Sequence, residues 1–219
     1  MQKLSSKVCS HYEFKYYQGE QNGLPAEAHV CLQDHSRFVL PDLARPYRGL
    51  HLIRDPRDVL ISGAHYHGRS DEAWLHARQA RFMGRTCQQA IGGCRSLADA
   101  IAFEMRHEGG RTIREMLSWT YSNPLIFEAK YEDLIGDDGM ERMAKTFAFL
   151  CYPQDALPEL VAIARSVSIF HGGADCLGHV RDGSAKQWVQ VFDERLKALF
   201  IDCFDDALIR LGYEVNHAW

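Results

Sequence analysis

An arginine and a serine flank the start of a capped helix in the stretch LHLIRDPRDVLISG, residues 50–63. The mostly apolar residues 50–53 predict a short buried strand, and Asp55 followed by proline predicts the N-cap of a helix. The first turn of a helix presents free backbone N–H groups and a partial positive charge, which favour anions. Arg54 before this turn and Ser62 two turns later could therefore bind a phosphate together. The alternative interpretation is a solvated arginine that caps its own helix.

Two further segments carry residues that could complete such a site. PLIFEAKYEDLIGD, residues 124–137, reads as a buried strand with Tyr131 directly after it. HVRDGSAKQW, residues 179–188, is a polar loop that carries Arg181 and Gly183 and leads toward the last helices. Taken alone, these features are typical of an amphipathic tyrosine and of a flexible loop anchored by a tryptophan.

Together, and in this order, the three segments resemble the nucleotide-binding motifs of the sulfotransferase family that uses 3'-phosphoadenosine 5'-phosphosulfate (PAPS). In that family an arginine and a serine eight positions later bind the 3'-phosphate, and Arg54 and Ser62 have this spacing. The family's Y-E-D-L element implies that Tyr131 lies beside the adenine. Its C-terminal R-K-G-x-x-G-x-W signature implies that Arg181 and Gly183 lie at the phosphate.

The chain departs from the family pattern in two places. Asp182 stands where the family usually has lysine, and Lys186 stands where it usually has the second glycine. Family members also begin with a strand, a K-[ST]-G-[ST]-like loop that cradles the 5'-phosphosulfate, and a helix. This sequence contains no such loop, and residues 1–12 predict the helix that would follow it. We therefore expect the chain to start just downstream of its own phosphosulfate site.

Sulfuryl transfer needs a base for the proton of the acceptor and positive charge for the departing phosphate, and in principle it needs no metal. His35 follows a predicted strand at about 28–32, where the family's catalytic base lies, and is the candidate base. Asp34 could orient it or replace it, and an ordinary loop histidine among the eleven of the chain is the alternative interpretation. His65 and His67 lack a carboxylate or cysteine at metal-ligand spacing, so we expect no metal site and assign them to the lining of an acceptor pocket.

Composition narrows the class of protein. With 219 residues, 46% hydrophobic and 25% charged, the chain is long enough for one domain, residues 1–219, with a sizeable core. A formal net charge of −4 argues against nucleic acid, so Arg54, Arg57 and Arg181 should form a local site for a small nucleotide.

The cysteines and the hydropathy pattern indicate where in the cell the protein is located. The seven cysteines are dispersed, without C-x-x-C or zinc-like spacing, and favour reduced thiols in the cytoplasm. No apolar run approaches the roughly twenty residues of a membrane span, and no signal peptide is evident. We therefore expect a cytoplasmic protein without a membrane span, and the sequence leaves its oligomeric state open.

Strands that alternate with helices predict an α/β fold. Helical periodicity marks residues 1–12, 97–122 with an interruption at 109–110, 140–150, 157–167 and 192–211, whereas 68–94 reads as polar and irregular and could cover an acceptor pocket. We expect a three-layer sandwich with a central parallel sheet and right-handed crossovers. The resemblance implies a sulfotransferase-like P-loop nucleotide-binding fold that is N-terminally truncated.

The resemblance implies transfer of a sulfuryl group from PAPS to a hydroxyl or amine of a small-molecule or sugar acceptor. The alternative is a catalytically impaired relative that binds 3'-phosphoadenosine nucleotides, or a protein partner, without turnover. A nucleoside or sugar kinase is a weaker interpretation, because it needs the same loop and a magnesium-binding Ser or Thr. The acceptor itself cannot be read from the sequence, since variable loops form acceptor pockets.

Overall fold

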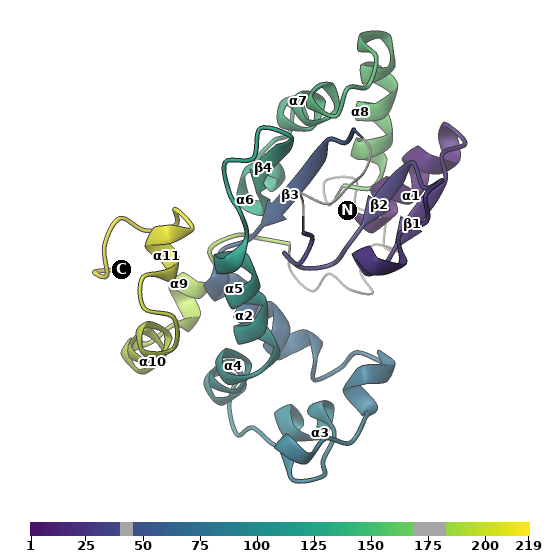
Figure 1. Ribbon diagram of the computed structural model, residues 1–219. Coiled ribbons are helices and arrows are strands. Elements are labelled where there is room, and N and C mark those ends of the chain that lie inside the picture. The colour runs from purple at the N-terminus through teal and green to yellow at the C-terminus, as the bar shows by residue number, and fades with distance from the viewer. Residues whose placement is uncertain (40–45, 169–182) are drawn as a thin grey trace. The chain divides into compact units, whose positions relative to one another are not determined.

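The computed structural model describes residues 1–39, 46–168 and 183–219 (Figure 1). Within it the chain forms two compact units. The first unit comprises Met1–Ile53 and Ser118–Gly183, and the second comprises Arg54–Leu117 and Ser184–Trp219. The expectation of one domain over residues 1–219 stays a prediction.

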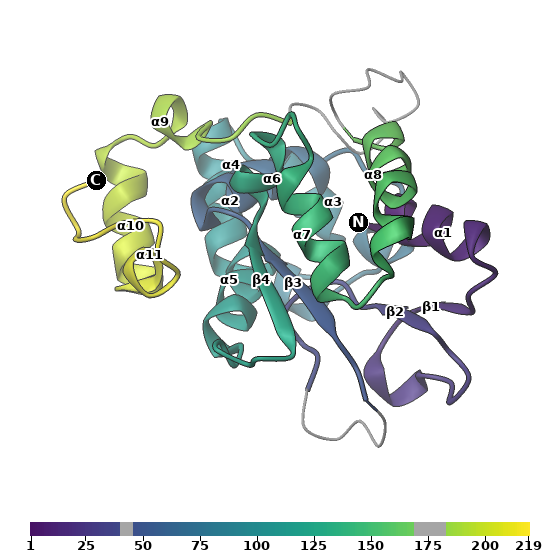
Figure 2. The same ribbon diagram turned by 90° about the horizontal axis from the view of Figure 1, so that it is seen from above.

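The first unit contains two pairs of parallel strands. β1 (Tyr16–Gln18) pairs with β2 (Val30–Leu32), and β3 (Gly49–Ile53) pairs with β4 (Ile126–Lys130). Figure 2 shows β3 and β4 side by side. Parallel pairing requires a long crossover between the two strands, and here more than seventy residues separate them. The predicted α/β class with parallel strands is confirmed, and within the described residues each sheet has two strands.

The helices of the first unit build its core. They are α1 (Gln2–His11), α6 (Tyr131–Ile135), α7 (Glu141–Phe149) and α8 (Leu157–Ser166), with short 3-10 turns η1 (Gln21–Gly23) and η5 (Gln154–Ala156). Leu4 and Val8 of α1 pack against Phe147 of α7 and the fully buried Leu160 of α8. The helices predicted over 1–12, 140–150 and 157–167 are confirmed, because an apolar stripe at helical spacing is what each contributes to this core.

The second unit is helical in the part of the chain that the structure describes. Its elements are α2 (Pro56–Tyr66), η3 (Ala73–His76), η4 (Ala80–Phe82), α3 (Cys87–Gly92), α4 (Leu97–Arg106), α5 (Glu108–Ser118), α9 (Trp188–Val191), α10 (Glu194–Phe204) and α11 (Ala207–Arg210). Helix α4 packs against both α2 and α10. Leu60, Ile101, Leu196 and Phe200 are among the fully buried side chains of this unit.

The helix break predicted at residues 109–110 in the second unit was wrong. The break between α4 and α5 falls at His107, and Gly109 and Gly110 lie inside α5. A Cβ at Gly109 would stand 2.8 Å from a methyl of Leu60, and one at Gly110 would overlap the carbonyl oxygen of Met105. These glycines therefore permit close approach and do not end a helix.

The segment 68–94 is also more regular than its polar composition predicts. It contains η3, η4 and α3, and α3 begins with a capping box in which Thr86 and Gln89 bond reciprocally. The helix predicted over 192–211 is divided into α10 and α11, because Asp205 adopts a left-handed backbone with φ of 46°. Among the described residues, no helix combines the length and apolar character needed to cross a membrane.

Candidate functional site

The junction between β3 and α2 forms as the sequence predicts. Asp55 is the N-cap of α2, and its carboxylate accepts a hydrogen bond of 2.9 Å from the backbone N–H of Arg57. Pro56 occupies the first helical position, where its missing N–H costs nothing. The cap is a local feature, and local residue types were sufficient to find it.

Arg57 lies in a buried cage within the second unit. Its side chain Nε and Nη2 donate to the carboxylate of Asp55 at 3.0 and 2.7 Å, and Nη1 lies 2.7 Å from Glu214. The guanidinium carbon stands 3.4 Å from the ring centre of Trp188 and 4.7 Å from that of Trp219. Arg57 is only 1% exposed, so the expectation that it would join a local anion site was wrong: two carboxylates and two indole rings already hold it.

Asp58 connects the first turn of α2 to the segment 184–188. Its fully buried carboxylate accepts hydrogen bonds from the backbone N–H of Lys186 at 2.8 Å and of Trp188 at 3.0 Å. Arg54 adds a bond to the same segment, since its Nη2 donates to the carbonyl of Ser184 at 3.1 Å. Burial raises the pKa of Asp58, while the N–H of Trp188 and the charge of Arg54 oppose this shift.

The remaining predicted site residues fall in different places. Ser62 is exposed on α2 of the second unit. Tyr131 opens α6 in the first unit, and its hydroxyl donates to the carbonyl of Gly183 at 2.8 Å. His35 is exposed in the loop after β2, with a left-handed φ of 68°. Arg181 lies outside the described residues.

The structure thus joins predicted motif segments in two pairs. Arg54 of the first motif contacts Ser184 of the third, within the second unit. Tyr131 of the middle motif contacts Gly183, the residue before Ser184, within the first unit. A role for both pairs at one nucleotide stays a prediction, as does the role of His35.

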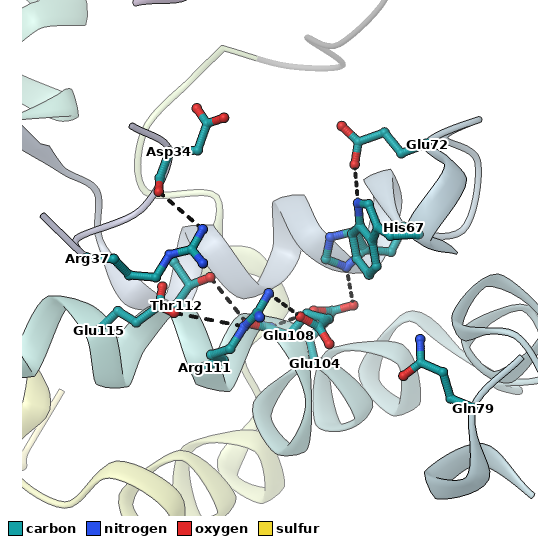
Figure 3. A network of polar contacts seen from close by, with 12 residues as sticks. Asp34, Arg37, His67, Glu72, Gln79, Glu104, Glu108, Arg111, Thr112 and Glu115 are labelled. Atoms are coloured by element: carbon teal, nitrogen blue, oxygen red, sulfur yellow. Dashed lines mark hydrogen bonds and ion pairs between the residues drawn. The ribbon is translucent and has the colours of Figure 1, made fainter. Parts of the chain in front are cut away.

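His67 has a carboxylate partner that sequence spacing did not reveal. Its Nδ1 lies 2.7 Å from Glu104, a fully buried residue of α4 whose other oxygen accepts from the N–H of Gly109 (Figure 3). The ring of Trp74 stands edge-on to the histidine at 5.2 Å. Thirty-seven residues separate His67 from Glu104, so only the packing of α2 against α4 brings them together. Within the described residues, no three side chains of metal-ligating type form a group that could hold an ion.

Comparison of the chain with models of protein families, with curated proteins and with solved structures gave no match. The functional argument therefore depends on the motifs and on the contacts described above.

Replacement of Arg57 tests the structural role of the buried cage. Arg57→Ala leaves Asp55 and Glu214 without their cation, and the loss of one partner from a buried ion pair costs about 3–5 kcal/mol. We expect the free energy of unfolding to fall by this amount, measured by denaturant titration with tryptophan fluorescence. The matched control is Arg69→Ala, which removes an exposed arginine of the same unit and should change the free energy of unfolding by no more than about 0.5 kcal/mol. Equal losses of unfolding free energy in the two variants would contradict the structural role of Arg57.

The raised pKa of Asp58 predicts a pH dependence of stability. The folded state binds this proton more tightly than the unfolded chain does, so the contribution is fully present below the ordinary pKa of 3.8. It is lost as pH rises through the pKa of the folded state. Asp58→Asn does not titrate, so the unfolding free energy of wild type minus that of the variant should be larger at about pH 4 than at about pH 7. Denaturant titrations of both proteins across this range measure the difference, and a smaller value at acid pH would overturn the assignment.

Proposed function

We propose that this chain binds a 3'-phosphoadenosine nucleotide at the first turn of α2 and is a PAPS-dependent sulfotransferase that acts on a hydroxyl or amine acceptor. One observation carries the proposal: segments that resemble the first and third nucleotide-binding motifs meet, although 130 residues separate Arg54 from Ser184. Chance resemblance in two unrelated segments gives no reason for them to touch.

The electrostatics of the first turn support an anion there. Asp55 is neutralised by Arg57, and Asp58 is bonded to two backbone N–H groups. Arg54, whose side chain is 19% exposed, lies 3.8 Å from Asp58 and is the cation that a phosphate would share with this carboxylate. The dipole of α2 also favours negative charge at this end of the helix.

The register of β3 and β4 supports a binding site at the carboxyl ends of these two strands. Ile53 at the end of β3 lies opposite Lys130 at the end of β4, and Tyr131 directly follows Lys130 in the first unit. Ligands of parallel α/β folds bind beyond the carboxyl ends of the strands. The proposed fold is accordingly a three-layer sandwich around a parallel sheet, of the sulfotransferase-like P-loop type.

In the proposed reaction the acceptor oxygen or nitrogen attacks the sulfur of PAPS. The bond from sulfur to the 5'-phosphate oxygen breaks, 3'-phosphoadenosine 5'-phosphate leaves, and a base takes the acceptor proton. His35 is the proposed base. Arg54 and Ser62, with Arg181 and Gly183, are assigned to the 3'-phosphate, and Tyr131 is assigned to the adenine.

A second candidate function is nucleotide binding without turnover. This candidate needs only the contacts at Arg54 and the first turn of α2, and it needs no group that holds the transferred sulfuryl. Both functions use the same contacts to the 3'-phosphate.

Calorimetric titration of the full chain with 3'-phosphoadenosine 5'-phosphate tests the shared step. We expect saturable binding that weakens about 10- to 100-fold in Arg54→Ala, because a hydrogen bond to a charged group contributes about 1.5–3 kcal/mol. The matched control is Arg69→Ala, an exposed arginine of the same unit, which should leave the affinity unchanged.

Absence of binding by the folded chain, or equal affinity in Arg54→Ala, would contradict the nucleotide site. If binding is found, conversion of PAPS in the presence of a panel of phenol, steroid, sugar and lipid acceptors separates the two functions. Acceptor-dependent release of 3'-phosphoadenosine 5'-phosphate supports the transferase, and binding without release supports the second candidate.

A further inference from the structure

A serine, a histidine and a glutamate form a line of short contacts in the first unit. Ser36 Oγ lies 2.8 Å from His51 Nε2, and His51 Nδ1 lies 2.6 Å from Glu128 Oε2. Ser36 follows β2, His51 belongs to β3, and Glu128 of β4 is its direct partner in the parallel register. None of the three was a candidate from sequence, because only strand pairing brings them together.

Aromatic residues hold the imidazole in place. Trp119 stacks on His51 with ring centres 4.1 Å apart and planes 19° apart, and its indole N–H donates to Glu128 Oε1 at 2.9 Å. Tyr121 lies at 5.7 Å from the same ring. The ring is thus fixed at both edges and on one face.

The carboxylate of Glu128 can only accept, so His51 Nδ1 carries a proton. In the neutral form of the ring, Nε2 then carries a lone pair that accepts the hydroxyl proton of Ser36. A hydroxyl that donates to an imidazole oriented by a carboxylate is the arrangement of a serine nucleophile, and it is recognised by geometry on unrelated folds.

The pair of His51 and Glu128 also stabilises the contact between β3 and β4, but this role has no need of a serine at Nε2. Ser36 is 8% exposed and His51 is 7% exposed. Such limited access restricts any substrate to a small one.

We propose that Ser36 is the nucleophile of a second activity, the hydrolysis of small acyl esters. Ser36 Oγ attacks the carbonyl carbon and its proton moves to His51 Nε2. The ester C–O bond breaks, His51 protonates the departing alkoxide, and an acyl-serine remains. Water then attacks the acyl carbon by the same route, which releases the carboxylic acid and restores Ser36. This activity is independent of the nucleotide site at α2.

The test is covalent labelling of the full chain with methanesulfonyl fluoride, a small reagent with which a Ser–O–S bond forms and fluoride leaves. We expect one adduct per chain, placed on Ser36 by peptide mass mapping and absent from Ser36→Ala. His51→Gln should slow labelling at least about 100-fold, because general base catalysis contributes about 10²- to 10⁴-fold. Glu128→Gln should slow it about 10-fold or more, and hydrolysis of p-nitrophenyl acetate should fall in parallel.

The matched control is Ser10→Ala, which removes an exposed serine of α1 and should leave labelling unchanged. Thermal unfolding verifies that each variant folds. If His51→Gln does not fold, the labelling rate of Glu128→Gln tests the proposal instead. Absence of an adduct on Ser36 in the folded wild type would overturn the proposal. So would labelling whose rate is the same in wild type and in the folded His51 or Glu128 variant.

Discussion

The buried carboxylates at the first turn of α2 are the constraint on which the candidate site depends. Removing a charge from water costs several kcal/mol, so each buried carboxylate must find donors in the folded chain. Asp55 finds them in Arg57, and Asp58 finds them in the backbone of Lys186 and Trp188. The segment 184–188 therefore cannot leave α2 without exposing an unsatisfied acceptor, and this keeps it beside Arg54.

Two arginines three residues apart consequently have different roles. Arg57 is surrounded by carboxylates and indole rings, and its charge is used within the fold. Arg54 lies 3.8 Å from Asp58 and donates to the carbonyl of Ser184, a neutral acceptor that a phosphate could replace. The same few residues thus combine a rigid support with a cation at its edge, which is the combination that anion recognition requires.

Residue type and spacing within one segment predicted caps and helices correctly. They did not predict features that depend on contacts with residues far away in the sequence. The cap at Asp55 and the helices of the first unit follow from residue type and spacing alone. The prediction of a helix break at Gly109 and Gly110 was wrong, because the methyl of Leu60 and the carbonyl of Met105 that they accommodate belong to other helices, α2 and α4. The burial of Arg57 depends on Glu214, and the line from Ser36 to Glu128 depends on strand register. No pattern within one segment contains that information.

The measurement that tests the central claim most directly is an amide NMR titration of the isotope-labelled chain. The nucleotides to compare are 3'-phosphoadenosine 5'-phosphate and adenosine 5'-monophosphate, which differ only in the 3'-phosphate. We expect saturable shifts at the amides of residues 54, 55, 57, 58 and 184–188 with the first nucleotide and much weaker shifts with the second. Equal responses to both, or shifts confined to other parts of the chain, would contradict it.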